Sequence, residues 1–272
     1  MIHQMNIYGK DKVETAIERL RTFEPPEGYF LAFSGGKDSV VIKALADMAG
    51  VKYDAHYSVS SVDPPELVQF VKTFPDVSRD IPHDKDGNPV TMWNLIPKKG
   101  MPPTRLARYC CVAIKEQSGI GRFVITGVRW EESVRRRATR AGLELGDTAT
   151  RERERIDPDN PDQELIHICP TKAQRVINPI IDWTTKEVWE FIREYNVRYC
   201  ELYDQGFTRL GCIGCPMGGG ESQVKEFARY PKYKRNYLRA FKKMLSQHES
   251  VGRAGSWNTP EEVMTWWTEG KV

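Results

Sequence analysis

The sequence predicts an α/β fold with a doubly wound, mostly parallel sheet, because apolar runs typical of buried strands alternate with helical patterns. The first run spans 29–33, breaks into Ser-Gly-Gly, and precedes apolar residues at helical spacing from Val40 to Leu45. Two further strand-like runs span 52–59 and 122–128. Ligands of such sheets bind at the carboxyl ends of the strands, so functional residues are expected there.

Three helices are predicted from residues that cap an apolar stripe. Asp11 precedes the first helix, the segment Asp63-Pro-Pro-Glu66 begins the second, and Thr184-Thr-Lys-Glu187 forms a capping box before the third. Residues 141–164 are polar, and within them residues 157–162 are predicted to form an irregular loop.

The composition is that of a chain with a substantial core, since 40% of its 272 residues are apolar and seven are tryptophans. The net charge of +3 is nearly balanced, so charge alone does not argue for nucleic acid. No apolar run approaches the length of a membrane span, and the N-terminus lacks a signal-peptide pattern, so we expect a cytoplasmic protein with no membrane partner. In that reducing setting the six cysteines are better interpreted as metal ligands or reactive thiols than as disulfides.

The segment after the first strand is predicted to cradle phosphate. Its residues are Ser34, Gly35, Gly36, Lys37, Asp38 and Ser39. The glycines allow a sharp turn close to a ligand, and the helix that follows adds unpaired N–H donors and partial positive charge. Lys37 can neutralise charge on the phosphates, and Asp38 can hold Mg²⁺. The Walker A pattern is absent.

Two cysteine pairs form a second candidate site, consisting of Cys110, Cys111, Cys212 and Cys215. Four thiolates suit either a tetrahedral zinc ion or a [4Fe–4S] cluster, and adjacent cysteines reach the several irons of a cluster more easily than one zinc ion. Cys169 lies in an apolar run and is predicted to be buried and inert. Two alternatives stay open for Cys200, which could act as a nucleophile or replace one of these four metal ligands.

From Lys225 to Lys243 aromatic residues interleave with Lys and Arg. Such a helix could place cations on phosphates and aromatics on bases. An aromatic stripe at this spacing is more often the buried face of an amphipathic helix, with basic residues outside, and we prefer that interpretation. We expect a nucleotide-binding domain with the cysteine site over 1–216, followed by a helical C-terminal extension over 217–272.

The motifs resemble those of a known family. Ser34-Gly-Gly-Lys-Asp-Ser39 resembles the PP-loop of the ATP pyrophosphatases, which cleave ATP between the α- and β-phosphates. Residues 108–115 and 211–215 resemble the cluster-binding pattern of adenosine 5′-phosphosulfate reductases, and Ile125-Thr-Gly-Val-Arg129 and residues 178–206 resemble further stretches of them. The chain is identified as a member of the phosphosulfate reductase-like superfamily, which implies an adenine nucleotide alpha-hydrolase-like fold.

The resemblance also implies the site. ATP and Mg²⁺ would bind at the loop 34–39 together with Gly127 and Arg129, with Lys37, Asp38 and Arg129 as catalytic residues, and the two cysteine pairs would hold a [4Fe–4S] cluster. The reductases attack sulfate sulfur with a cysteine near the C-terminus, whereas no cysteine follows Cys215 in this sequence. It looks more like the reductase-related proteins of DNA phosphorothioation and other sulfur-transfer systems.

We therefore expect an ATP pyrophosphatase of sulfurtransferase type that activates an acceptor, such as a DNA phosphate or a nucleic-acid base, with release of pyrophosphate. The implied partners are ATP, a sulfur donor such as a cysteine desulfurase, and nucleic acid or other sulfur-transfer proteins. One alternative is an adenylyl-sulfate or phosphoadenylyl-sulfate reductase that uses an external thiol. A second alternative is a non-catalytic regulator that binds nucleotide and DNA.

Overall fold

The structure is a computed structural model that describes residues 2–3, 5, 9–116, 118–147, 153–156, 158–159, 173–250, 252 and 256–269. The chain forms two compact units. The first contains Met1–Tyr57, Gln69–Arg79 and Gly119–Leu210, and the second contains Ser58–Val68, Asp80–Ser118 and Gly211–Val272. The expected domains 1–216 and 217–272 are not tested by this packing and stay a prediction.

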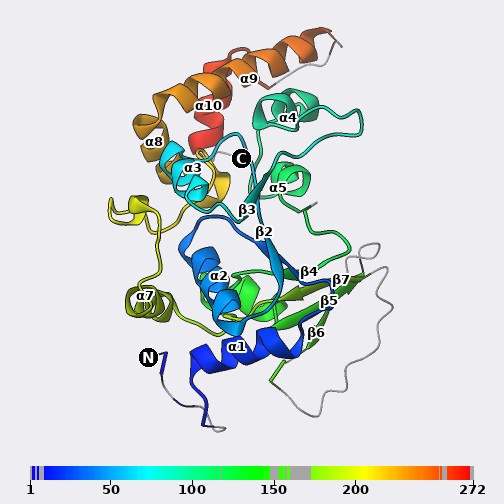
Figure 1. The fold of residues 1–272 in the computed structure, drawn as a ribbon. Helices are drawn as coiled ribbons and strands as arrows, with labels where there is room; N and C mark the ends of the chain where they lie inside the picture. The colour runs from blue at the N-terminus through cyan, green and yellow to red at the C-terminus, as the bar shows by residue number, and fades with distance from the viewer. Residues whose placement is uncertain are drawn as a thin grey trace. The chain divides into compact units, whose positions relative to one another are not determined.

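A mostly parallel sheet underlies the first unit (Figure 1). In the described part of the chain it has seven strands in the order β3-β2-β1-β4-β7-β5-β6. Strand β1 pairs in parallel with β2 and β4, β4 pairs in parallel with β7, and β5 pairs antiparallel with β7 and β6. The strands are β1 (Tyr29–Ala32), β2 (Tyr53–Ser58), β3 (Val77–Asp80), β4 (Phe123–Ile125), β5 (Leu143–Asp147), β6 (Arg153–Ile156) and β7 (Ala173–Ile177).

The order of the strands reverses between β1 and β4, because the chain proceeds from β1 to β2 on one side and reaches β4 on the other. In open α/β sheets, ligands bind beyond the carboxyl ends of the strands at such a reversal. The loops that follow β1 and β4 are the ones that carry the predicted nucleotide-binding residues. The α/β fold class is confirmed.

Three helices of the first unit begin where the sequence predicts them. Helix α1 (Lys12–Thr22) has Asp11 as its N-cap, α2 (Lys37–Ala49) follows Gly36, and α7 (Thr185–Glu194) has the capping box of Thr184. Helix α2 packs against both α1 and α7. A short helix, α6 (Val134–Thr139), follows β4, and α3 (Pro65–Lys72) begins in the second unit and ends in the first.

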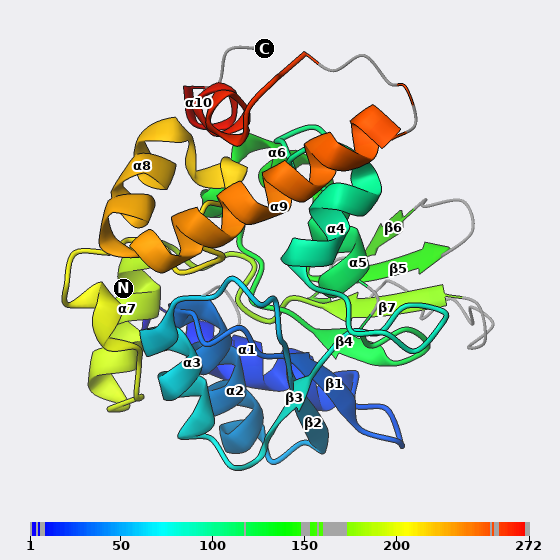
Figure 2. The ribbon, with the colours of Figure 1, turned by 90° about the horizontal axis from the view of Figure 1, so that it is seen from above.

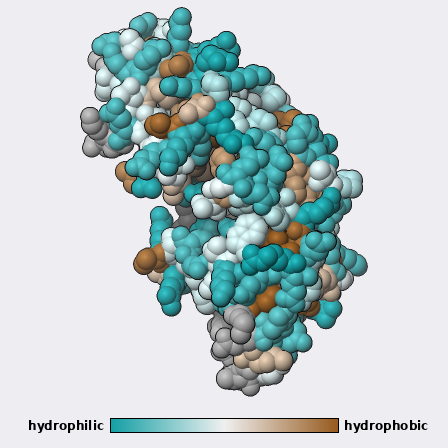
Figure 3. Space-filling view, turned by 90° about the vertical axis from the view of Figure 1, so that its left-hand side faces the viewer, coloured by the Kyte–Doolittle hydropathy of each residue, from teal (hydrophilic) through white to brown (hydrophobic). Residues whose placement is uncertain are grey.

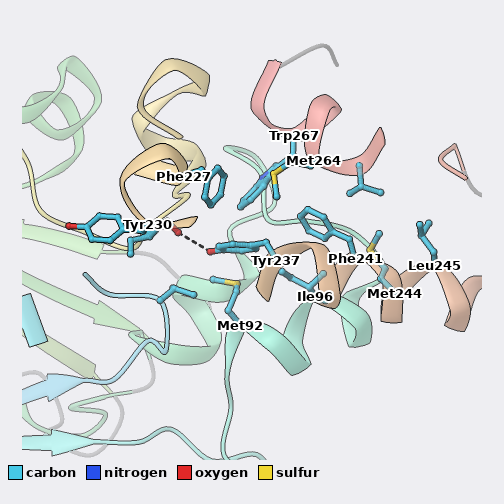
Figure 4. Packing of buried hydrophobic residues seen from close by; sticks show 14 residues of the cluster. Met92, Ile96, Phe227, Tyr230, Tyr237, Phe241, Met244, Leu245, Met264 and Trp267 are labelled. Atoms are coloured by element: carbon cyan, nitrogen blue, oxygen red, sulfur yellow. Dashed lines mark hydrogen bonds between the residues drawn. The ribbon is translucent and has the colours of Figure 1, made fainter. Parts of the chain in front are cut away.

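The second unit is mainly helical. Its helices are α4 (Met92–Lys99), α5 (Tyr109–Ile114), α8 (Gly220–Arg229), α9 (Pro231–Ser250) and α10 (Pro260–Glu269). Helix α9 packs against α4, α8 and α10 (Figure 2). These helices place aromatic side chains in one core, where Tyr237 and Phe241 point toward Phe227 and Trp267 (Figure 4). The aromatic stripe is therefore buried, as we preferred, but the single helix expected over 225–243 is wrong, because α8 ends at Arg229 and α9 begins at Pro231.

Part of the polar stretch 141–164 forms strands that the sequence did not indicate, since β5 and β6 pair as an antiparallel hairpin. Of the predicted loop 157–162 only residues 158–159, in a turn, belong to the described residues, and Cys169 lies outside them.

No helix in the described part of the chain is long and apolar enough to cross a membrane. The face drawn in Figure 3 is mostly hydrophilic, with apolar residues in small separate groups.

Candidate functional site

The loop Ser34–Ser39 leads from β1 into α2 at the reversal of the strand order. Gly35 has a φ of 73°, in the left-handed region that favours glycine. Gly36 is the N-cap of α2, and a Cβ there would lie 3.5 Å from the Ser34 and Tyr203 hydroxyls. The glycines thus keep side chains away from the first turn of α2, whose N–H groups and partial positive charge attract anions.

The two serines stabilise the loop from within. The Ser39 hydroxyl donates to the carbonyl of Gly36 at 2.8 Å, and the N–H of Gly36 donates to the Ser34 hydroxyl at 3.4 Å. The two hydroxyls lie 3.3 Å apart. These hydrogen bonds within the loop stabilise the turn.

Tyr203 is a member of this site that sequence reasoning missed. The backbone N–H of Lys37 donates to its hydroxyl at 2.9 Å, and its ring packs edge-on against Trp189 at 5.1 Å. Burial raises the pKa of Tyr203, so the phenol stays protonated and keeps a hydrogen to donate to an anion. The only sequence signal was its place in the segment 178–206 that resembles the family.

Asp38 lies between two cations. Its carboxylate accepts from Lys37 Nζ at 3.0 Å and from Arg129 Nε at 2.7 Å. Arg129 is 1% exposed, and its other nitrogens donate to the Glu131 carboxylate, the Trp183 carbonyl and the Thr185 hydroxyl at 3.0, 3.1 and 3.2 Å. The structure thus brings Lys37, Asp38 and Arg129 together, with the guanidinium of Arg129 bonded to protein groups.

Gly127 allows this arrangement. A Cβ on Gly127 would lie 3.0 Å from the Cβ of Asp38 and 3.1 Å from its backbone, which is tighter than most real Cβ contacts. A side chain at this position would therefore require the segment after β4 or the first turn of α2 to shift slightly. All the residues predicted to bind nucleotide, from Ser34 to Ser39 and at Gly127 and Arg129, belong to the first unit.

The two cysteine pairs belong to the second unit. Cys110 and Cys111 lie on α5, whereas Cys212 and Cys215 flank a turn in which the N–H of Cys215 donates to the carbonyl of Cys212 at 3.1 Å. Gly214 in that turn has a φ of 74°, and a Cβ there would lie 2.6 Å from the ring of Phe227. The turn is therefore held tightly against the aromatic core of the second unit.

Charged groups surround these thiols. A hydrogen bond from Cys110, together with a hydrogen bond from Arg108 and the charge of Arg108, lowers the pKa of Cys111. The bond to Cys111 and burial raise the pKa of Cys110. Burial raises the pKa of Cys212 to about 11, against the charge of Lys115. The electrostatic interaction with Cys212 is in turn the main reason that the pKa of Lys115 is raised.

Asp63 also contacts this site. Its carboxylate accepts from the backbone N–H of Ser60 at 3.3 Å and from the Cys212 thiol at 3.7 Å. The sequence indicated Asp63 only as the start of α3. Its contact with Cys212 could not be read from the sequence, because the two residues are 149 positions apart and only the fold brings them together.

The donor set suits an iron–sulfur cluster in its chemistry. The four cysteines are free, and they interact electrostatically with one another and with Arg108 and Lys115. Soft thiolates select such clusters or zinc, and cations nearby offset their negative charge. Among the described residues, no group of three or more His, Cys, Asp or Glu side chains lies in an arrangement that could hold a metal ion. Cys200 is fully buried and belongs to the first unit.

Residues 28–217 match the family model described as the phosphoadenosine phosphosulfate reductase domain. The chain belongs to this family. It is 26% identical to an uncharacterized protein of Methanocaldococcus jannaschii over 233 residues. This match covers 85% of this chain and 51% of that protein. The chain is 38% identical over 52 residues to the adenosine 5′-phosphosulfate reductase of Oceanobacillus iheyensis, which covers 19% of this chain and 22% of that enzyme.

The chain is similar to a crystal structure of phosphoadenylyl-sulfate reductase from Candida auris in a phosphate complex. The TM-score is 0.46 and the sequence identity 16%, and the match covers 73% of this chain and 88% of that one. The chain spans about half, or less, of the length of the curated relatives that it matches. Membership of the superfamily, inferred from the motifs, is confirmed by the family match.

Proposed function

We propose that the chain is an adenylating enzyme of sulfur transfer that binds ATP and Mg²⁺ at the loop Ser34–Ser39. An acceptor oxygen would attack the α-phosphorus, the bond from that phosphorus to the bridging oxygen would break, and pyrophosphate would leave with the electron pair. The observation that carries this proposal is the glycine-lined first turn of α2 at the strand reversal, with Lys37 and Asp38 beside it.

Each group at the loop has a task in this reaction. The backbone N–H groups and Lys37 would hold the leaving pyrophosphate and offset the charge that develops on it. Asp38 would hold the metal ion, which when bound would offset negative charge on the phosphates. Arg129 would position the Asp38 carboxylate through the 2.7 Å bond from its Nε. A direct contact between Arg129 and phosphate, as the resemblance implied, stays a prediction.

We infer that Cys110, Cys111, Cys212 and Cys215 hold a [4Fe–4S] cluster. When bound, such a cluster supplies soft iron sites suited to binding sulfur. Arg108 and Lys115 would offset its negative charge, as they already interact with the thiols that would bind it. The turn at Gly214 would present its two thiols from a rigid position.

The acceptor we propose is a nucleic-acid phosphate or base. Displacement of AMP from the adenylated acceptor by a sulfur nucleophile would complete the transfer, with the sulfur delivered by a donor such as a cysteine desulfurase or another sulfur-transfer protein. One observation supports sulfur transfer over sulfate reduction. The 272 residues contain no cysteine after Cys215 to attack sulfate sulfur.

The test of the reaction follows the fate of ATP. Cluster-loaded protein receives Mg²⁺, a sulfide source, total nucleic acid, and ATP labelled at the α- or the γ-phosphate. We expect AMP and pyrophosphate, with most turnover lost in Asp38→Asn. Asp47→Asn is the matched control, because it makes the same change on α2 where the carboxylate serves Lys43 and Tyr53. Formation of ADP and phosphate would overturn the mechanism.

The test of the cluster uses anaerobically purified protein. We expect about four irons and four acid-labile sulfides per chain, both lost in Cys212→Ser or Cys215→Ser. Cys200→Ser is the matched control and should retain both. Zinc in place of iron would refute the cluster, and iron retained in Cys110→Ser but lost in Cys200→Ser would show that the ligand set is wrong.

A reductase that uses an external thiol is the second candidate, favoured by the family to which the chain belongs. Adenylyl sulfate and its 3′-phosphorylated form are offered with reduced thioredoxin. Sulfite that disappears in Cys200→Ala would establish this alternative, because Cys200 would then be the nucleophile. Nucleotide-dependent DNA binding without release of pyrophosphate or sulfite would instead identify a regulator.

A further inference from the structure

The exposed side of α9 carries a row of cations, which we call the α9 basic face. It consists of Lys232, Arg235, Arg239, Lys242 and Lys243, all exposed. At about 100° per residue these five positions fall within an arc of about 100° and extend over roughly 16 Å of the helix axis. The buried side chains Tyr237, Phe241 and Met244 lie on the opposite side of the helix (Figure 4).

The α9 basic face has no acidic counterpart on its own helix. Residues 227–248 contain no Asp or Glu. Within the part of the chain that the structure describes, none of the five cations forms an ion pair, and Arg239 donates only to the Asn236 side chain, at 3.5 Å. This differs from Arg229 at the end of α8, which pairs with Glu66 at 3.0 Å.

The arrangement opposes the stability of the helix. Lys232 and Arg235 are three residues apart, Arg235 and Arg239 four, and Arg239 lies three and four residues from Lys242 and Lys243. Like charges at these spacings face each other on a helix and destabilise it. A polyanion bound along the row would turn this repulsion into attraction, which gives the arrangement a physical rationale.

We propose that the α9 basic face binds the sugar–phosphate backbone of a nucleic acid. One strand of a duplex places a phosphate about every 3.4 Å of axis, so a row of roughly 16 Å matches about five phosphates, one for each cation. The aromatic side chains of α9 are buried in the core and are not available to stack on bases. The contact is therefore with phosphates and does not depend on base sequence.

An anionic membrane is a poorer match for this face. Helices that bind in the membrane interface insert an apolar side between the lipids. The apolar side of α9 is instead packed against α4, α8 and α10. A phosphate backbone requires only the exposed cations, so nucleic acid is the partner to which the geometry points.

The experiment measures binding of the full chain, without ATP, to labelled nucleic acid. Fluorescence anisotropy is recorded with about 20 base pairs of random-sequence duplex DNA, and with duplex RNA and single strands of the same length, from about 50 to 200 mM salt. The test variant is Arg235→Gln/Arg239→Gln/Lys242→Gln. The matched control, Lys52→Gln/Lys85→Gln/Lys98→Gln, removes the same charge from exposed positions elsewhere.

We expect the test variant to bind at least about tenfold more weakly at 100 mM salt, and the slope of log affinity against log salt to become shallower by about 2 to 3. The control variant should bind within about twofold of the wild-type affinity and should keep the wild-type salt slope. The variant Arg235→Lys/Arg239→Lys keeps the charge and should retain binding. An unaltered circular dichroism spectrum and urea midpoint establish that the test variant is folded.

Several results would overturn the proposal. The test variant could bind as the wild type does, the control could lose as much affinity, or the affinity could be independent of salt. Stronger binding to phosphatidylserine vesicles or to polyglutamate than to every nucleic acid would identify a different partner. The proposal deepens the acceptor class of the proposed function, yet the test requires no turnover, so either can fail while the other holds.

Discussion

The strongest prediction concerns the buried guanidinium of Arg129, which joins α2, β4 and α7 within the first unit. Replacing Arg129 by Met keeps an unbranched side chain but removes the cation and its four hydrogen bonds. The Asp38 carboxylate loses the donor at 2.7 Å, and the Trp183 carbonyl, in a buried position, loses its donor at 3.1 Å. The bonds to Glu131 and Thr185 are lost as well.

The loss in free energy of unfolding that Arg129→Met causes can be worked out from the burial of its partners. Removing one partner of a buried ion pair costs about 3–5 kcal/mol, and a buried acceptor left without a donor costs about 1–3 kcal/mol. Two facts reduce this sum. Asp38 keeps its bond from Lys37, and the side chains of Asp38 and Glu131 are 22% and 45% exposed, so water can solvate their charge. We therefore expect Arg129→Met to lower the free energy of unfolding by roughly 3 kcal/mol.

Equilibrium urea unfolding measures this loss, and a double-mutant cycle with Asp38→Asn isolates the pair, for which we expect a coupling of about 1–3 kcal/mol. Arg136→Met is the control. Arg136 lies on the exposed helix α6 and pairs with Glu132, which precedes that helix, so its loss should cost less than about 1 kcal/mol. A loss below about 1 kcal/mol for Arg129→Met, or no coupling to Asp38, would refute the view that Arg129 positions the carboxylate.

Three further predictions concern the first unit. Tyr203→Phe removes the hydroxyl that accepts from the Lys37 N–H and that we expect to donate to a phosphate. The change should weaken binding of ATP–Mg²⁺ about tenfold or more by calorimetry, and unchanged or tighter binding would show that the phenol is not a donor to the nucleotide. Gly127→Ala should displace Asp38, lower turnover and cost about 1–3 kcal/mol of unfolding free energy, whereas wild-type activity would disprove the close approach. Although burial alone would raise it, the pKa of Glu187 is lowered from its ordinary value of 4.5 by hydrogen bonds that include one from Lys12. Its contribution to stability is thus full above about pH 4.5 and is lost as the pH falls through the lowered pKa, and Glu187→Gln should remove that part of the acid dependence of unfolding.

The elements that the sequence predicted correctly are those in which local chemistry and tertiary packing agree. Asp11 and Thr184 cap their helices with side-chain bonds to nearby backbone, and the strand before Ser34 is buried on both faces. The strands β5 and β6 were missed because their polar sequences have no apolar run. They are held by pairing with β7 and with each other, which only the assembled sheet supplies.

Helix α4 was missed for a different reason. It contains Pro97, which removes a backbone donor and usually ends a helix. The helix persists because Leu95 and Ile96, beside the proline, are buried, Met92 at its start packs in the core, and Gly100 ends the helix in a left-handed conformation. Tertiary packing thus outweighs the local preference.

The residues of the candidate site likewise fall into those that local sequence predicts and those that only the fold brings together. The loop Ser34–Ser39 was predictable because its glycines, lysine and helix start are consecutive in the chain. Tyr203 was not, since its bond to Lys37 joins residues 166 positions apart. The burial of Arg129 was also invisible, because a pattern that contains Gly and Arg does not reveal whether the guanidinium faces solvent or, as here, the Trp183 carbonyl.

The arrangement around α2 favours catalysis by fixed charges over catalysis that requires rearrangement. Asp38 is held by Lys37 and Arg129, and Arg129 is held in turn by Glu131 and Thr185, so the charges that would meet a nucleotide are already oriented. Donors and cations oriented before the reaction stabilise developing charge without a cost of reorganisation. The first unit therefore contains the complete set of groups that our mechanism uses for adenylation.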